Sequence, residues 1–258
     1  MQSQSYSGRW LSETIREICR QQGITLRSLS DGWLLELEKN DKTTRILGFT
    51  FDINSAAASS IGRDKVATYE LVKVHDIPVI PHWLVRLSDP AVNWNGFDWA
   101  AGIVVKPLTG MGGENVCLFY DAPTAKTFMQ GKMIEAWALS PLAPITREIR
   151  VIMLDGKMLF TYGKQPVTLG GLKVFNLSKG AVPVPYTPTA EQVQLAKEVQ
   201  KTLGLRLAAV DIVELAPGEW RVLEVNSTIT MKKYAEYSEQ NQKDARRVYA
   251  AIIEAMFL

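Results

Sequence analysis

The chain has few of the residues that mark several common classes of protein. It contains two cysteines and two histidines among 258 residues, too few for a disulfide framework or for a zinc site built on these side chains. Positive and negative charges nearly balance, leaving a net charge of +2, so nothing favours binding to nucleic acid or to an acidic membrane. No stretch approaches about 18 uncharged apolar residues, the minimum for a membrane-spanning helix.

The remaining composition is typical of a globular protein. Hydrophobic residues make up 47% and charged residues 22% of the chain, which is long enough for one large core or for two or three subdomains. The first residues lack the charged segment and apolar core of a secretory signal. Together with the low cysteine content, this predicts a cytoplasmic protein. We expect His75 and His82 at the surface or in packing roles, and Cys19 and Cys117 in the core.

Hydrophobic periodicity predicts mixed helices and strands. A helix is expected over 9–22 and strands over 32–38 and 44–50, which together form a small αβ unit. Asp64 is expected to cap a helix over 65–75. Residues 77–81 are expected to break this helix and to begin an extended strand. Later predicted strands cover 103–106, 116–120, 132–137, 147–154 and 157–162, and later helices cover 123–129, 189–203 and 242–257. The Ser140–Pro144 segment, with two prolines, is the expected boundary between subdomains.

One stretch carries a candidate metal site. Residues 221–230 contain Glu224 and Asn226, and alternate residues of a strand share one face. An upstream apolar run carries a single acid, Asp211, and the Pro-Gly turn between the runs predicts a hairpin. Pairing would bring these three side chains together, and oxygen ligands favour magnesium or manganese over zinc. The alternative is an edge strand whose acids face water.

A glycine-rich segment carries a candidate phosphate site. Thr109–Gly113 lies between two predicted strands, where its backbone N–H groups can close over phosphates. It lacks the features of a Walker loop and of a Rossmann turn. Lys106 lies in an apolar strand and Lys65 in the first turn of a helix, positions that an anionic partner would explain. The alternatives are a flexible hairpin with Lys106 reaching solvent and a solvated Lys65.

Taken in order, these segments resemble the ATP-grasp superfamily, especially its RimK-like carboxylate–amine ligases. The resemblance runs from about Asn54 to Tyr234. It is carried by Arg63-Asp-Lys65, Val104 to Gly113, Ile134-Glu-Ala-Trp137, Arg147-Glu-Ile-Arg150, Asn176-Leu-Ser-Lys-Gly180, Asp211 and Glu224-Val-Asn226. It implies an α+β fold in which two subdomains, 63–139 and 140–258, clasp ATP, preceded by a short αβ domain over 1–62.

The resemblance also implies roles for particular residues. Arg150 and Lys179 would stabilise charge on the transferring phosphoryl group and on the tetrahedral intermediate, although Arg150 fits equally well as a structural partner of Glu148. Asp211, Glu224 and Asn226 would hold magnesium or manganese. Nucleotide contacts are expected from Lys65, Lys106, Gly110, Gly112, Gly113, Glu135, Ala136, Trp137, Glu148 and Asn176.

The activity implied is ATP-dependent joining of a small-molecule or peptide carboxylate to an amine, through an acyl phosphate. A homo-oligomer is also implied. Two other functions stay open: a kinase on the same fold, and an ATP-binding module without turnover. The sequence departs from the family at Lys179, where relatives often have arginine. It departs again at Ser227–Thr230, which replaces a small-residue loop containing Pro-Gly, so the acceptor stays undefined.

Overall fold

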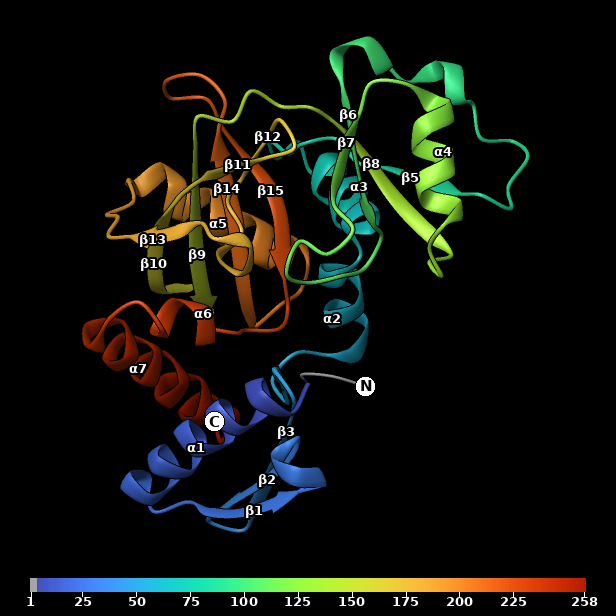
Figure 1. The fold of residues 1–258 in the computed structure, drawn as a ribbon. Coiled ribbons are helices and arrows are strands. Elements are labelled where there is room, and N and C mark those ends of the chain that lie inside the picture. Colours follow the sequence, from blue (N-terminus) through green and yellow to red (C-terminus); the bar gives the residue numbers. More distant parts are fainter. Residues whose placement is uncertain (1–3) are drawn as a thin grey trace.

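A computed structural model describes residues 4–258, with side chains from residue 10 onward. This part of the chain has an α+β fold with three larger antiparallel sheets and one two-stranded hairpin (Figure 1). An N-terminal unit lies at the bottom of Figure 1, and two sheets lie side by side above it. Helices α2 and α3 run between the N-terminal unit and the upper part of the molecule.

The N-terminal unit is one helix packed on a sheet of strand order β1-β2-β3-β4. Its elements are α1 (Gln4–Gln22), β1 (Thr25–Leu29), β2 (Leu34–Lys39), β3 (Lys42–Leu47) and β4 (Thr50–Phe51), with a 3₁₀ turn at Ser30–Gly32. The expected helix and the first expected strand are present. The second is split, because Gly48 turns the chain at φ +57°. Strand β1 was not predicted, since its side chains are mostly exposed and show no alternation.

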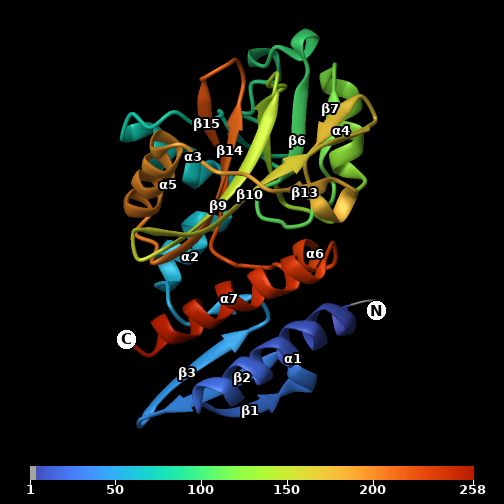
Figure 2. The same ribbon diagram turned by 90° about the vertical axis from the view of Figure 1, so that its left-hand side faces the viewer.

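This unit shares its hydrophobic core with the C-terminal helix. Helix α7 (Glu239–Met256) is capped by Ser238 and lies between the N-terminal unit and the larger sheet (Figure 2). Apolar residues of α1, β2 and β3 form one buried cluster with those of α7 and with Leu207 of the larger sheet. The N-terminal unit therefore lacks a core independent of the rest of the chain.

Two short helices lead from this unit to the next sheet. Helix α2 (Ala56–Arg63) is capped by Ser55, and α3 (Lys65–Val74) by Asp64, whose side chain accepts hydrogen bonds from two backbone N–H groups, as expected. Residues 77–81 end the helical segment, as expected, and the regular strand that follows starts at Trp83. They pair at one point, where Val79 lies parallel to Val222.

The central sheet has the order β5-β8-β6-β7. Its strands are β5 (Trp83–Arg86), β6 (Ile103–Pro107), β7 (Cys117–Phe119) and β8 (Ala136–Pro141), and α4 (Ala122–Gln130) packs on it. Two 3₁₀ turns, Trp94–Gly96 and Trp99–Ala101, precede β6. The strand predicted over 132–137 is wrong in position, because β8 begins only at Ala136.

The C-terminal sheet has the order β13-β10-β9-β14-β15. Its strands are β9 (Arg147–Leu154), β10 (Lys157–Gln165), β13 (Val182–Val184), β14 (Leu207–Glu214) and β15 (Trp220–Asn226). The remaining elements are the hairpin β11 (Val167–Leu169) and β12 (Leu172–Val174), a 3₁₀ turn at Leu177–Lys179, and helices α5 (Ala190–Thr202) and α6 (Lys232–Ala235).

The alternation along β9 decides what each face of this sheet does. Ile149 and Val151 pack into the core that includes α5. The residues between them point to the opposite face. There, Ile152 joins the core that includes α7, whereas Glu148 and Arg150 line a cavity. One half of this face is therefore packed and the other half is left for a site.

The division into 1–62, 63–139 and 140–258 stays a prediction. The three larger sheets fall largely within those ranges, but α2 and β8 each cross a proposed boundary. Within residues 4–258, no helix combines the length and the apolar character needed to cross a membrane.

Candidate active site

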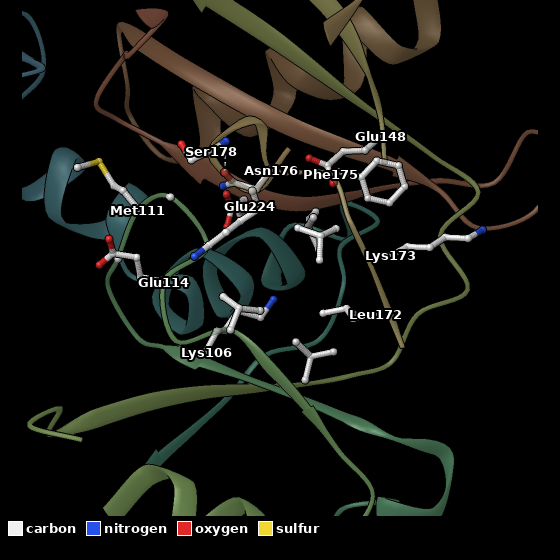
Figure 3. A pocket seen from close by; sticks show the side chains of 18 of the residues that line it. Lys106, Met111, Glu114, Glu148, Leu172, Lys173, Phe175, Asn176, Ser178 and Glu224 are labelled. Atoms are coloured by element: carbon white, nitrogen blue, oxygen red, sulfur yellow. Dashed lines mark hydrogen bonds between the residues drawn. The ribbon is translucent and has the colours of Figure 1, made fainter. Parts of the chain in front are cut away.

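A cavity of about 1340 Å³ lies between the central and C-terminal sheets. Ligand sites commonly enclose about 300–1,000 Å³, so this one has room for more than one small molecule. Figure 3 shows side chains reaching into it from both sides, with Lys106 on one side and Glu148 and Glu224 on the other. The two sheets thus contribute different chemical groups to a single space.

On the C-terminal sheet, four polar side chains form a row across adjacent strands. Tyr162 pairs with Arg150, Arg150 with Asp211, and Asp211 with Glu224. Residues directly opposite in antiparallel strands project from the same face. A register shift after Asp211 leaves Leu223 as an extra residue in β15, and a bulge of this kind changes the direction of neighbouring side chains. The expected pairing of Asp211 with Glu224 is present.

Asp211 is held by two cations. Its Oδ1 accepts hydrogen bonds from Arg150 Nε at 2.8 Å and from Lys164 Nζ at 2.9 Å, and its Oδ2 accepts one from Arg150 Nη2 at 2.6 Å. Burial raises the pKa of Asp211, but the charges of Arg150 and Lys164 outweigh burial and hold this pKa well below its usual range. Asp211 is therefore a carboxylate at neutral pH.

Lys164 also forms an ion pair with Glu148. Burial raises the pKa of Glu148 to about 6 against the opposing charge of Lys164. Two acids and two bases thus make a compact, charge-balanced network on one face of the sheet. Arg150 pairs with Asp211 in this network, so Glu148 and Arg150 are linked through Lys164 and Asp211 rather than by a direct ion pair.

The residues of the expected metal site are brought close together. Asn226 Nδ2 donates a hydrogen bond to Glu224 Oε1 at 3.4 Å, so the two side chains lie together on the cavity wall. The Glu224 carboxylate and the Asn226 Oδ1 are oxygen donors of the kind that a hard divalent cation prefers. Asp211 has fewer free positions. A carboxylate offers about four lone-pair sites, and Arg150 and Lys164 take three of them. Glu224 and Asn226 can therefore both offer oxygen ligands to a metal, whereas Asp211 has one lone-pair site left for this purpose.

The central sheet supplies the expected lysines. Lys106 on β6 and Lys65 at the start of α3 both line the cavity. Lys106 Nζ lies 3.0 Å from His82 Nε2. Burial and the charge of Lys65 lower the pKa of Lys106 to about 8, although Glu224 opposes the change. His82 was expected at the surface or in packing, but it is buried and bound to this lysine.

The glycine-rich loop between β6 and β7 covers part of the cavity. Gly112 and Gly113 have φ values of +74° and +68°, which glycine adopts without the penalty that a side chain imposes. Met111 Sδ lies 3.4 Å from Thr228 Oγ1, so the loop reaches from the central sheet to the segment after β15. Gly110 lines the cavity as well.

The loop containing Asn176 and Lys179 closes another side. Asn176 Oδ1 accepts a hydrogen bond from the Ser178 backbone N–H at 2.8 Å, and Gly180 ends the turn at φ +102°. Lys179 and Asn176 line the cavity, as expected. The Asn176 amide therefore shapes the loop that presents Lys179.

The structure does not bring the expected adenine-binding residues to the cavity. Trp137 is fully buried in the core of the central sheet, Glu135 is exposed, and neither they nor Ala136 line the cavity. The residues that do so begin at Ser140 and continue to Thr146. The reason is the later start of β8, whose far end leads to the C-terminal sheet.

Two functional candidates had weak signals in the sequence. Lys164 lies two residues beyond the predicted end of its strand, and only the register of β10 with β9 reveals that it faces Glu148. His82 follows a proline-containing segment and shows no periodicity. Both are buried polar residues whose significance comes from partners distant in the chain.

The arrangement defines a class: two antiparallel sheets that enclose a cavity, with lysines and a glycine loop on one side and acidic oxygens on the other. Residues 62–250 match the RimK-like ATP-grasp domain. The match covers more than half of the chain, so the chain belongs to this family.

Similar proteins agree with this assignment. A probable alpha-L-glutamate ligase of Psychromonas ingrahamii is 28% identical over 212 residues, which cover 75% of this chain and 68% of that protein. The solved D-alanine–D-alanine ligase of Bacillus anthracis has a TM-score of 0.62 at 17% identity, covering 79% of this chain and 70% of that one.

A further solved structure carries ligands. The ATP-grasp ligase PsnB, complexed with minimal precursor, Mg and ADP, has a TM-score of 0.54 at 16% identity, over 80% of this chain and 62% of that one. The expected family, the α+β ATP-grasp fold and the enzyme class, an ATP-dependent carboxylate–amine ligase, are confirmed.

Proposed function

We propose that the chain binds ATP and a divalent metal in the cavity between its two upper sheets and joins the carboxylate of an amino acid or peptide to an amine. The observation that carries this is the placement of Lys65, Lys106 and the glycine loop opposite Glu224 and Asn226 in one space. The names of the similar ligases support an amino acid or peptide as the substrate.

Bound ATP would supply the phosphoryl group that turns a carboxylate into a reactive acyl phosphate, and bound Mg²⁺ would supply charge neutralisation. Glu224 and Asn226 would hold the metal, and Asp211 would contribute its remaining lone pair. Lys65 and Lys106 would donate hydrogen bonds to phosphate oxygens. Each of these groups is already placed by a strand or a helix terminus, which keeps the site preorganised.

The other residues act on the reacting groups and on water. The carboxylate oxygen attacks the γ-phosphorus with loss of ADP, and the amine nitrogen then attacks the acyl carbon with loss of phosphate. Arg150 and Lys179 would stabilise the negative charge that develops in these steps. The loop from Gly110 to Gly113 would exclude water from the acyl phosphate. We place the adenine ring against residues 140–146, near Leu172.

The large cavity supports two substrates in addition to the nucleotide. We further propose that the enzyme works in the cytoplasm, where its two free cysteines would stay reduced. A homo-oligomer also stays a prediction.

The first test is calorimetric binding of ATP with and without Mg²⁺, on wild type and on Glu224→Gln. Binding that requires Mg²⁺ and weakens in the variant supports the site. A screen of carboxylate and amine pairs, read by product mass, then tests the reaction. A product that carries phosphate and no amide would replace the ligase with a kinase, and the absence of ATP binding would refute the nucleotide site.

A further inference from the structure

The segment 77–82 connects the two sheets through hydrogen bonds. Ile80 N–H donates to the Val222 carbonyl at 2.8 Å, and Val222 N–H donates to the Pro78 carbonyl at 2.9 Å. Val222 lies on β15, two residues before Glu224. At its other end the segment carries His82, which contacts Lys106 of the central sheet. A short path of bonds therefore links the candidate metal strand to the phosphate-side lysine.

The bonding partners of His82 define its protonation. Its Nδ1 lies 3.0 Å from the Ile80 carbonyl oxygen, which can only accept, so Nδ1 carries the hydrogen. The ammonium of Lys106 can only donate, so Nε2, 3.0 Å from Nζ, must offer its lone pair. A second proton on the ring would point at the ammonium. Burial and the charge of Lys106 also lower the pKa of His82, so this histidine is neutral.

A neutral acceptor has a consequence that a carboxylate would not have. His82 is 2% and Lys106 8% exposed, so the pair is withdrawn from solvent. The bond to His82 fixes Nζ without cancelling its charge, and no carboxylate among the described residues forms an ion pair with it. A buried ammonium that forms no ion pair is unfavourable. The Glu224 and Glu148 charges act on it without contact, and an anion in the cavity would stabilise it further.

We propose that His82 is a positioning residue for the nucleotide: it holds the Lys106 ammonium at the cavity wall, without an ion-pair partner, for a phosphate oxygen. This inference rests on the proposed function. It adds that the contacts of His82, Ile80 and Val222 fix the position of Lys106 relative to strand β15, which carries Glu224.

A double-mutant cycle tests the inference. Calorimetry with Mg²⁺ and ATP would compare wild type, His82→Leu, Lys106→Met and the double variant. We expect His82→Leu to weaken ATP binding at least about tenfold, the effect of losing one hydrogen bond to a charged group. In the Lys106→Met background the same change should have no further effect. Adenosine, which lacks phosphate, should bind His82→Leu as it binds wild type.

The controls separate positioning from folding. His82→Gln keeps an acceptor near Nε2 and should retain most of the affinity, while His75→Leu, at the exposed end of α3, should match wild type. Thermal unfolding of every variant shows whether it is folded. Equal losses for ATP and adenosine, or an undiminished effect of His82→Leu in the Lys106→Met background, would overturn the inference.

A measurement made without nucleotide distinguishes failure of the His82 proposal from failure of the proposed function. The chain has two histidines, so a long-range ¹H–¹⁵N spectrum contains two imidazole systems, and His75→Gln assigns them. We expect His82 as the neutral Nδ1–H tautomer at pH 7. A protonated ring or the Nε2–H tautomer would contradict the bond to Lys106. The expected tautomer with no ATP binding would instead refute the nucleotide site while leaving the pair intact.

Discussion

The two sheets that face the cavity hold their buried cations in opposite ways. On the C-terminal sheet, Arg150 and Lys164 are neutralised by Asp211 and Glu148. On the central sheet, Lys106 is bound by a neutral imidazole. The difference is visible in the pKa values: Asp211 raises the pKa of Arg150 above its ordinary range against burial, whereas burial lowers that of Lys106 to about 8.

This difference suggests that the network on the C-terminal sheet has a structural role, whereas Lys106 has a role in ligand binding. A charge-balanced network holds its members in fixed geometry and contributes to the stability of the sheet. A lone ammonium destabilises the folded chain and gains most when an anion arrives. Lysine therefore has a structural role at Lys164 of the C-terminal sheet and a ligand-binding role at Lys106 of the central sheet. The predictions below test that distinction.

The largest effect on stability is expected from breaking the network. Asp211→Asn would leave Arg150 and Lys164 without their shared counter-charge in a buried position, and breaking such a pair typically costs about 3–5 kcal/mol. Urea unfolding would measure the loss. The matched control is Asp155→Asn, which removes a similar two-point contact to Arg206 at the surface, where both side chains are more than 40% exposed. An exposed pair contributes about 0–1 kcal/mol, and equal losses in the two variants would remove the distinction.

Lys106→Met should lower activity strongly without lowering the free energy of unfolding, the reverse of the main effect expected for Asp211→Asn. Removing one preorganised donor from an active site typically lowers turnover about 10²–10³-fold, and we expect this loss once a substrate pair is identified. Because the variant also removes a buried ammonium, its free energy of unfolding should equal or exceed that of wild type. Turnover and urea midpoints, measured on the same preparations, check both halves. A variant that is both inactive and destabilised would make Lys106 structural.

The pH dependence of the two walls should also differ. The pKa of Lys106 falls from 10.5 to about 8 on folding, so between these values the unfolded chain binds more protons. Stability should therefore rise with pH across this window, by on the order of 3 kcal/mol at most. ATP affinity should fall over the same range, up to about tenfold per pH unit, as the ammonium is lost. Comparing wild type with Lys106→Met isolates this contribution.

On the C-terminal sheet, Asp211 has the same sign as Lys106 but acts at acidic pH, and Glu148 has the opposite sign. The pKa of Asp211 is depressed by folding, so its contribution is present at neutral pH and is lost as pH falls through the folded value. Glu148, whose pKa rises from 4.5 to about 6, gains stability over that interval as pH falls. Acid unfolding of wild type and Asp211→Asn would measure the Asp211 contribution. Because the Asp211 charge also raises the pKa of Glu148, the Glu148 contribution should shrink in the same variant.

Local patterns predicted much of the fold and the ordered set of motifs. The Asp64 cap, the glycine loop and the hairpin of Asp211 with Glu224 each follow from a few neighbouring residues whose chemistry permits few alternatives. Residues that depend on distant partners were less accessible. Lys164 becomes meaningful only through its pairing across β9, and His82 only because residues 77–81 lie against β15.

The adenine segment shows a different limit. Ile134-Glu-Ala-Trp137 resembles the family's adenine-binding motif, but the strand starts at Ala136, four residues later than the apolar pattern predicted. The apolar pattern does not show whether Trp137 packs in the core or lines the cavity, and in the structure it packs in the core. The predicted adenine contact at Glu135, Ala136 and Trp137 stays a prediction, and the position of β8 decides which residues of this segment reach the cavity.

The smallest effects are expected from two substitutions that test whether the adenine ring contacts the start of β8 or the part of the cavity lined by Leu172. Glu135 is exposed and does not line the cavity, so Glu135→Ala should change ATP affinity by less than about twofold, as surface substitutions usually do. Leu172 lines the same cavity as residues 140–146, and Leu172→Ala should weaken binding of both ATP and adenosine by a few-fold, about 1 kcal/mol. Calorimetry with both ligands measures this. A loss in Glu135→Ala and none in Leu172→Ala would return the adenine contact to the start of β8.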